Sequence, residues 1–183
     1  MKNDNLKALT EGAIMVAAAQ VLGYIKLFSL PNGGSITLNM LPIFIYCARW
    51  GLGYGLLSGF LLGLLQLLLD GAFAWGWQSI IGDYLLAYTM IGIAGLFFRK
   101  NNGFFIGIIA GSVARFIVSW IVGATVWAEY MPDEFFGMTM TSPWFYSALY
   151  NGSYLLTSMV LCLIIGLLLY KSTKQYIVCK KEE

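Results

Sequence analysis

Long apolar segments take up most of this sequence and limit it to one class of fold. Such segments lie at about 8–28, 38–50, 52–69, 78–98, 104–127 and 145–170, the second being shorter than the others. A helix needs about 20 residues to cross roughly 30 Å of hydrocarbon. Only 11% of the 183 residues are charged, against about 25% in an average soluble domain. The sequence therefore predicts an all-α membrane protein, a six-helix transmembrane bundle that forms a single domain over residues 1–183.

The distribution of basic residues predicts how the bundle is oriented, because cytoplasmic loops carry an excess of Lys and Arg. With the N-terminus inside, nine of the eleven basic residues are cytoplasmic: Lys2, Lys7, Arg49, Arg99, Lys100, Lys171, Lys174, Lys180 and Lys181. The outer loops then lie at about 29–37, 70–77 and 128–143, and their charges include Asp70, Glu129, Asp133 and Glu134. We expect both termini in the cytoplasm and an outer face that favours cations.

Several function classes are excluded by residues that the chain lacks. It has no histidine, so it cannot form a Ser-His-Asp triad, a Cys-His pair or a histidine metal site. Its cysteines, Cys47, Cys162 and Cys179, stand singly without metal-ligand spacing. It has neither a Walker motif nor a dinucleotide fingerprint. We therefore expect no catalytic activity, no metal or cofactor and no nucleic-acid partner, and we expect the lipid bilayer to be its surroundings.

Asp83 is the residue that most directly indicates function. It lies within the apolar segment 78–98, and an ionisable group at membrane depth costs roughly 2.5–3.5 kcal/mol on insertion scales. Such groups face the bundle interior and mark substrate or ion paths. Arg115, in another apolar segment, offers an alternative interpretation, because it could serve as a purely structural counter-ion of Asp83.

Aromatic residues are concentrated at the same end of the predicted bundle as Asp83. An interfacial belt of Trp and Tyr explains many of them. Trp127, Tyr146 and Tyr150 flank the loop at 128–143, where they can stack on a flat cationic ring. Asn151 adds an amide that both donates and accepts hydrogen bonds. A carboxylate, aromatic walls and an amide together predict a pocket for a cationic aromatic heterocycle, with the loops at 29–37 and 128–143 as candidate lids.

Small residues at four-residue spacing predict close helix packing in lipid. One row begins just before the segment 52–69 and consists of Gly51, Gly55, Gly59 and Gly63. A second row, in the segment 104–127, consists of Gly107 and Gly111, and a third, in the segment 8–28, consists of Ala13 and Ala17. The glycine rows are most simply internal packing faces. The pair Ala13 and Ala17 fits either an internal face or a surface for a partner subunit.

Several motifs together resemble a known family. They are NGGSITL at 32–38, MLPI at 40–43, the pair Asp83-Tyr84, SPWFY at 142–146 and YNGSY at 150–154. This pattern resembles the thiamine-specific substrate-binding subunits, or S-components (ThiT family), of energy-coupling factor (ECF) transporters, and the likeness covers essentially the whole chain. It implies a six-helix S-component that captures thiamine at the outer face for ATP-driven uptake. Its implied partners are a transmembrane scaffold subunit, contacted through Ala13 and Ala17, and two ATPase subunits.

The resemblance also implies roles for single residues. The acidic pyrimidine-binding position of the family falls on Asp83, the aromatic residue that covers the thiazolium ring falls on Trp127, and polar positions of the last helix fall on Tyr146 and Asn151. This chain has Ser119 where the family usually has a histidine, and Asp83 where it typically has a glutamate. The expected ligand-binding residues are Asn32, Asp83, Tyr84, Ser119, Trp127, Trp144, Tyr146, Tyr150 and Asn151.

Three classes of function follow from these observations. The leading one is a thiamine-binding S-component without catalysis of its own, or one specific for a thiamine precursor or another flat cationic heterocycle. The second is a stand-alone secondary transporter in which Asp83 relays protons. A small intramembrane enzyme is disfavoured, because no nucleophile-base pair is visible.

Overall fold

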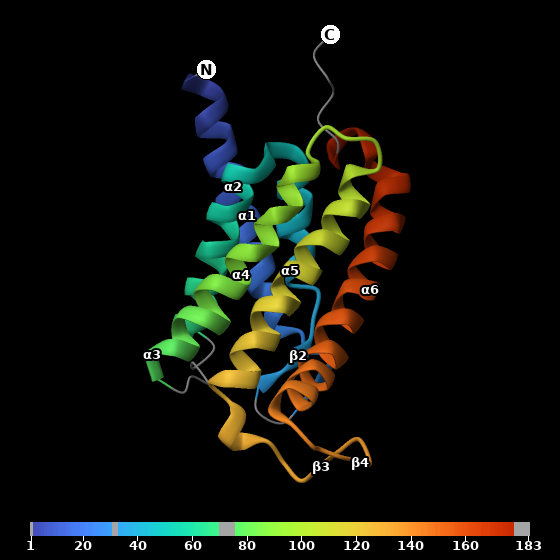
Figure 1. The fold of residues 1–183 in the computed structure, drawn as a ribbon. Coiled ribbons are helices and arrows are strands. Elements are labelled where there is room, and N and C mark those ends of the chain that lie inside the picture. Colours follow the sequence, from blue (N-terminus) through green and yellow to red (C-terminus); the bar gives the residue numbers. More distant parts are fainter. Residues whose placement is uncertain (1, 31–32, 70–75, 178–183) are drawn as a thin grey trace.

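The computed structural model describes residues 2–30, 33–69 and 76–177, and the main elements in this part of the chain are helical. Five helical segments are long and apolar enough to cross a membrane. They are α1 (Lys2–Tyr24), α2 (Met40–Leu69), the composite segment Gly76–Phe97, α5 (Gly103–Thr125) and α6 (Pro143–Ile177). The start of α1 and the end of α6 lie at the same end of an elongated bundle (Figure 1).

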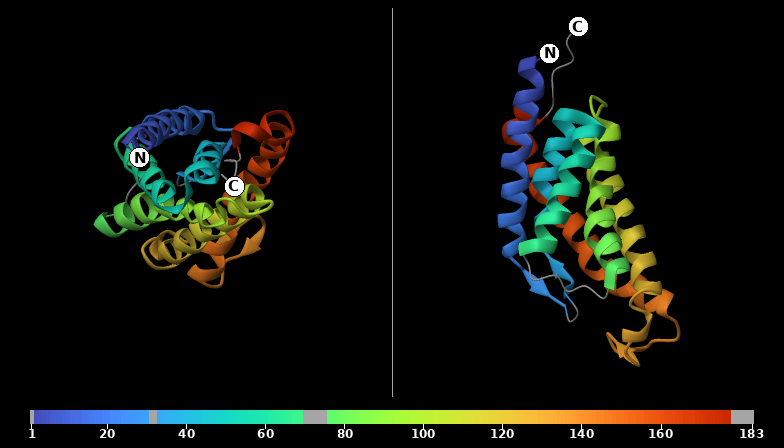
Figure 2. Two further views of the ribbon diagram at one scale, coloured as in Figure 1. Left: turned by 90° about the horizontal axis from the view of Figure 1, so that it is seen from above. Right: turned by 90° about the vertical axis from the view of Figure 1, so that its left-hand side faces the viewer.

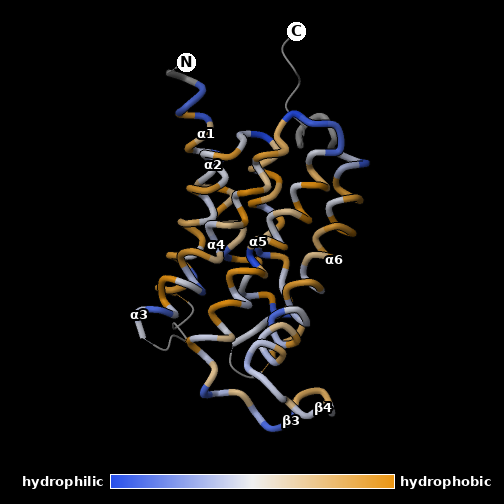
Figure 3. The backbone as a smooth tube through the Cα atoms, in the orientation of Figure 1, coloured by the Kyte–Doolittle hydropathy of each residue, from blue (hydrophilic) through white to orange (hydrophobic). Residues whose placement is uncertain are grey.

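Two short antiparallel hairpins close the opposite end of the bundle (Figures 1 and 2). In the first, β1 (Phe28–Ser29) pairs with β2 (Ser35–Ile36) between α1 and α2. In the second, β3 (Glu134–Phe135) pairs with β4 (Met138–Thr139), after the short 3-10 turn η4 (Ala128–Tyr130). Apolar residues dominate the middle of the helices, and hydrophilic residues gather towards the two ends, as a membrane-spanning bundle requires (Figure 3).

The two helices expected at 38–50 and 52–69 are joined within α2 without a loop between them. The backbone leaves the helical region only at Gly51, where φ is 80° and ψ is −166°. Glycine adopts this positive φ at little cost because it has no Cβ. The chain reverses its direction inside α2 at the end of the bundle where α1 begins (Figures 1 and 2). For this reason five helical elements, rather than the expected six, meet the criteria for crossing a membrane in the described residues.

The composite segment Gly76–Phe97 is not a regular α-helix. It consists of α3 (Gly76–Ser79), the π-helical turn η2 (Ile80–Leu86), α4 (Ala87–Met90) and the 3-10 helix η3 (Ile91–Phe97). π-helical turns widen the backbone locally and are frequent at functional sites. Here the widened turn contains Asp83.

The glycine row of α2 forms an internal packing face, as the sequence suggested. A Cβ atom on Gly55 would lie 3.0 Å from the carbonyl oxygen of Gly92 and 3.4 Å from its Cα. Those on Gly59 and Gly63 would contact the carbonyl oxygens of Tyr88 and Tyr84. Glycine at these positions lets the two backbones approach closely in lipid. Gly107 and Gly111 of α5 pack in the same way, whereas Ala13 and Ala17 on α1 are exposed.

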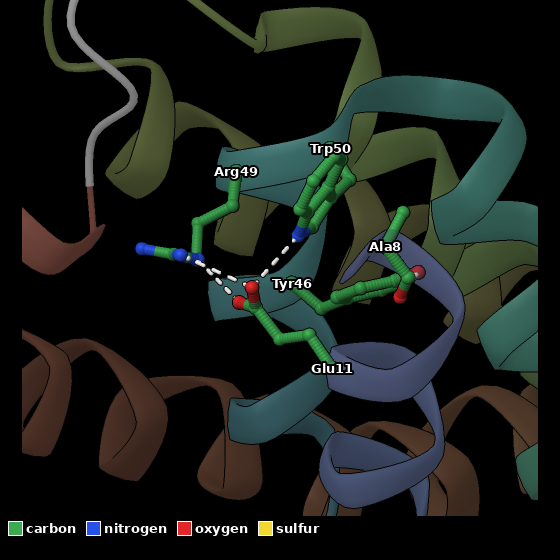
Figure 4. A network of polar contacts seen from close by, with 5 residues as sticks. All are labelled: Ala8, Glu11, Tyr46, Arg49 and Trp50. Atoms are coloured by element: carbon green, nitrogen blue, oxygen red, sulfur yellow. Dashed lines mark hydrogen bonds and ion pairs between the residues drawn. The ribbon is translucent and has the colours of Figure 1, made fainter. Parts of the chain in front are cut away.

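A polar cluster fastens α1 to α2 near the reversal at Gly51 (Figure 4). The carboxylate of Glu11 forms an ion pair with Arg49 and also accepts a 3.0 Å hydrogen bond from the indole N–H of Trp50. The hydroxyl of Tyr46 donates a 2.7 Å hydrogen bond to the carbonyl oxygen of Ala8. A carboxylate in an apolar helix is costly when unpaired, so these contacts explain why α1 tolerates Glu11 and hold α1 against α2.

We predict that Gly59→Ala lowers the thermal stability of the protein. The added methyl would collide with the backbone of Tyr88 and Thr89, and overpacking of this kind costs about 1–3 kcal/mol. Gly53→Ala is the matched control, because Gly53 lies on α2 with nothing within 4 Å of its Cβ position. Thermal unfolding in detergent, followed by tryptophan fluorescence, measures both variants. Equal midpoints for the two variants would contradict the packing described here.

Candidate ligand-binding site

A cavity of about 320 Å³ lies inside the half of the bundle that the two hairpins close. Its walls come from the end of α1, the loop after β1, α2, η2, α4, α5, η4 and α6. Residues distant in sequence therefore meet around one space that is large enough for a small organic molecule.

Asp83 is held in this cavity wall by two hydrogen bonds to one of its carboxylate oxygens. The hydroxyl of Ser79, one turn earlier, donates to Oδ2 at 3.0 Å, and the indole Nε1 of Trp127 donates to the same atom at 2.8 Å. Within the described part of the chain, no hydrogen bond is directed at Oδ1. Two donors thus fix the carboxylate and stabilise its charge, while Oδ1 is available to a ligand.

A row of aromatic rings lines the side of the cavity formed by α6. The ring centroids of Tyr146 and Tyr150 lie 5.7 Å apart, and those of Tyr150 and Tyr154 lie 5.8 Å apart. Phe135 of β3 extends this row, with its centroid 5.4 Å from that of Tyr146. Tyr146, Tyr150 and Tyr154 follow each other at intervals of four residues, so a single face of α6 presents them.

Asn151 uses its amide to join α5 to α6. Its Nδ2 donates to the carbonyl oxygen of Ser119 at 3.2 Å and to the carbonyl and hydroxyl oxygens of Ser147, each at 3.1 Å. Its Oδ1 accepts a 2.9 Å hydrogen bond from the hydroxyl of Tyr154. The amide therefore organises the wall of the cavity, and its oxygen retains the second lone pair of a carbonyl for a ligand.

The loop between β1 and α2 is hydrogen-bonded to α6 at the hairpin end of the bundle. The backbone N–H of Gly34 donates to the hydroxyl of Tyr150 at 2.9 Å, and that of Thr37 donates to the hydroxyl of Ser158 at 3.2 Å. A side chain on Gly34 would collide with Tyr150 and Tyr154. The described part of this loop is therefore joined to α6, because both hydrogen bonds end on α6 side chains.

Seven of the nine residues expected to bind the ligand line the cavity: Asp83, Tyr84, Ser119, Trp127, Tyr146, Tyr150 and Asn151. Asn32 lies outside the described residues. Trp144 is not part of the cavity wall; it is 47% exposed and makes an edge contact with Trp120. Sequence reasoning did not select Tyr154 or Phe135. The spacing of Tyr154 from Tyr146 and Tyr150 was an available signal, whereas the position of Phe135 depends on the hairpin β3–β4.

Arg115 also lines the cavity but does not pair with Asp83. No ion pair within 4 Å joins the two residues among those described. The guanidinium carbon instead lies 3.9 Å from the centroid of the Tyr88 ring, a cation–π contact. The idea that Arg115 is a direct structural counter-ion of Asp83 is therefore not supported by the geometry.

Comparisons with known proteins agree with this architecture. The family model described as thiamine transporter protein (Thia_YuaJ) matches residues 9–178. The protein named thiamine transporter ThiT in Bacillus subtilis strain 168 is 33% identical to this chain, with 92% of this chain and 93% of the relative covered. A protein of the same name in Lacticaseibacillus paracasei is 29% identical, with 98% and 94% covered.

A solved structure is similar to the whole bundle. ThiT from Listeria monocytogenes superposes with a TM-score of 0.85 at 26% sequence identity, covering 96% of this chain and all of that one. These relatives are named as transporters rather than enzymes, and the long apolar helices agree with a multi-pass protein of the cell membrane. The chain belongs to the thiamine transporter protein family.

Proposed function

We propose that this chain is an S-component that captures thiamine at the outer face of the membrane. The observation that carries the proposal is the Asp83 carboxylate, which is fixed by Trp127 and Ser79 inside a cavity with aromatic walls. Thiamine joins a permanently cationic thiazolium ring to an aminopyrimidine ring. A carboxylate binds the amino donor of such a ligand, and electron-rich rings attract its cation.

Each part of the cavity has a separate role in this proposal. Asp83 accepts hydrogen bonds from the aminopyrimidine through Oδ1. Trp127 covers the cationic ring, and its indole N–H bond to Asp83 keeps the ring and the carboxylate in one arrangement. Tyr84, Tyr146 and Tyr150 contribute to the aromatic wall, while Ser119 and Asn151 offer polar atoms. Because these groups are already positioned, little ordering is lost on binding.

The proposed topology places both termini in the cytoplasm and the two hairpins outside. In this arrangement the halves of α2 on either side of Gly51 count as two membrane helices, which makes six in a single domain. The basic residues Arg99 and Lys100 then lie inside, and the acidic residues Glu129 and Asp133 lie outside, in agreement with the positive-inside rule. The cavity opens towards the outer face, where an acidic surface attracts a cation.

The sequence has no ATP-binding motif, so ATP-driven import would need other subunits to hydrolyse the ATP. We propose that these are a transmembrane scaffold subunit and two ATPase subunits. The exposed positions of Ala13 and Ala17 on α1 support a docking face there, since small residues allow a partner helix to approach closely. A proton-coupled secondary transporter is the second candidate, favoured by the position of Asp83 within a membrane-spanning segment.

We predict that Asp83→Asn lowers thiamine affinity at least tenfold, equivalent to about 1.4 kcal/mol. The amide keeps the shape of the side chain but loses the negative charge and one acceptor. Asp133→Asn makes the same change in an exposed outer loop and should leave affinity unaltered. Quenching of tryptophan fluorescence by thiamine measures all three proteins. Unchanged affinity in Asp83→Asn would rule out the assigned role.

We predict that replacing Ala13 and Ala17 together with Trp abolishes association with the scaffold subunit and keeps thiamine affinity within twofold of the wild type. The bulky rings block close helix approach but lie on the outside of α1, away from the cavity wall. Ile109→Trp, at an exposed position of α5, is the control. Co-purification measures docking. Thiamine uptake by vesicles that contain only this chain would instead favour the secondary transporter.

A further inference from the structure

We propose that the inner end of the cavity is a hydrogen-bond acceptor subsite, in which Arg115 donates to an oxygen or nitrogen atom of the ligand. This inference rests on the proposed function and deepens it, because it states what the ligand carries besides a cation. Its class is a dipolar molecule that presents a positive or donating group to Asp83 and an accepting group to Arg115.

The first observation is that the hydrogen-bonding capacity of Arg115 is unused. The residue is only 8% exposed, and its buried Nε has no hydrogen-bond partner. Within the described ranges the guanidinium makes no ion pair within 4 Å, and it lies over the face of the Tyr88 ring. A guanidinium has five N–H donors, and a buried charge without partners is costly. An acceptor that enters the cavity would remove this cost.

The second observation is that Arg115 is held in place by its neighbours. Its guanidinium carbon lies 3.9 Å from the centre of the Tyr88 ring. The Tyr88 hydroxyl donates a 3.2 Å hydrogen bond to Oε1 of Gln66, whose Nε2 donates a 2.9 Å hydrogen bond to Oε1 of Gln20 on α1. These buried contacts link α4, α2 and α1, so they fix the ring on which the guanidinium rests. The donor is thus positioned before any ligand binds.

The third observation is that the two opposite charges remain separate inside one cavity. The carboxylate of Asp83 accepts hydrogen bonds from Trp127 and Ser79, and among the described residues no ion pair within 4 Å joins it to Arg115. Arg115 lies one helical turn from Ser119 on α5, and both residues face the cavity. Asp83, Trp127 and Arg115 all line the same cavity, so a ligand that spans the cavity can contact both charged groups at once.

The accepting group has two chemical sources. One is a neutral acceptor of thiamine itself, namely a pyrimidine nitrogen or the hydroxyl of its side chain. The other is the phosphate of thiamine monophosphate, which a guanidinium binds in a bidentate manner. Both sources use the same donors of Arg115, and titration of different ligands distinguishes them.

The test compares Arg115→Met and Arg115→Lys with the wild-type protein in detergent. Arg99→Met is the matched control, because Arg99 is exposed in the turn between η3 and α5, away from the cavity. Isothermal titration calorimetry, with competition for weak ligands, measures four probes: thiamine, thiamine monophosphate, the free aminopyrimidine and the free hydroxyethylthiazole. Thermal unfolding without ligand checks that each variant is folded.

We expect Arg115→Met to weaken thiamine binding at least tenfold, Arg115→Lys to weaken it less, and Arg99→Met to leave it unchanged. If Arg115 contacts thiamine itself, Arg115→Met weakens the binding of one of the two fragments, the aminopyrimidine or the hydroxyethylthiazole, at least tenfold more than that of the other. Only one of these fragments carries the acceptor atom that Arg115 contacts. If Arg115 contacts the phosphate, Arg115→Met lowers the affinity for thiamine monophosphate more than the affinity for thiamine. The proposal is overturned by affinities within twofold of the wild type, or by an equal loss for all four probes, which indicates general distortion of the cavity.

Arg115→Lys keeps the experiment decisive if Arg115→Met does not fold, since lysine retains the charge but not the planar fork of donors. Unaltered affinity for every probe in Arg115→Lys would then count against the subsite. Failure of the proposed function is a separate result, because it appears as absent thiamine binding in the wild-type protein. Failure of the subsite appears only in the comparison of variants.

Discussion

The hydrogen bond between the indole of Trp127 and the carboxylate of Asp83 is the interaction on which the site depends. It joins the segment between α5 and η4 to the π-helical turn η2 of another membrane-spanning segment. A charged group at membrane depth needs partners, and this contact provides one while leaving Oδ1 available. The same bond therefore stabilises the charge, closes one wall of the cavity and orients an aromatic ring beside the carboxylate.

Close helix packing positions this interaction. The glycine row of α2 allows the segment Gly76–Phe97 to lie against it, with Gly63 facing the backbone of Tyr84 next to Asp83. On the other side, Asn151 and Ser147 tie α6 to α5 through the carbonyl oxygens of Ser119 and Trp120. The cavity wall is thus held by close backbone contacts between helices and by hydrogen bonds from side chains of α6 to backbone carbonyl oxygens of α5. The backbone N–H groups of Gly34 and Thr37 donate hydrogen bonds to α6, so the described part of this loop is joined to the same wall.

Much of the fold could be predicted from the sequence because the lipid environment restricts a chain to few solutions. The lengths of the apolar segments indicated the membrane-spanning helices, and the spacing of glycines indicated their packing faces. The reversal at Gly51 was harder to interpret. Apolar residues continue on both sides of it, so composition alone does not distinguish two helices from one helix with a single non-helical residue.

The site was predicted in part, for reasons that differ between residues. Asp83 was recognisable because a carboxylate in an apolar segment is costly and usually marks a substrate or ion path. Trp144 was expected at the ligand together with Tyr146 of the same SPWFY motif, but α6 already begins at Pro143. Two residues of helix turn a side chain by about 200°, which directs Trp144 away from the face of Tyr146. The position of Arg115 over Tyr88 depends on how α4 and α5 pack, and spacing within one helix does not reveal that.

The most direct test of this account is a structure of the protein determined with thiamine bound in a lipid nanodisc. The account predicts that density for the vitamin fills the cavity, with the amino group of the pyrimidine within hydrogen-bond distance of Oδ1 of Asp83 and the thiazolium ring against Trp127. Density for thiamine elsewhere in the bundle, or inside the cavity without contact to Asp83, would contradict it.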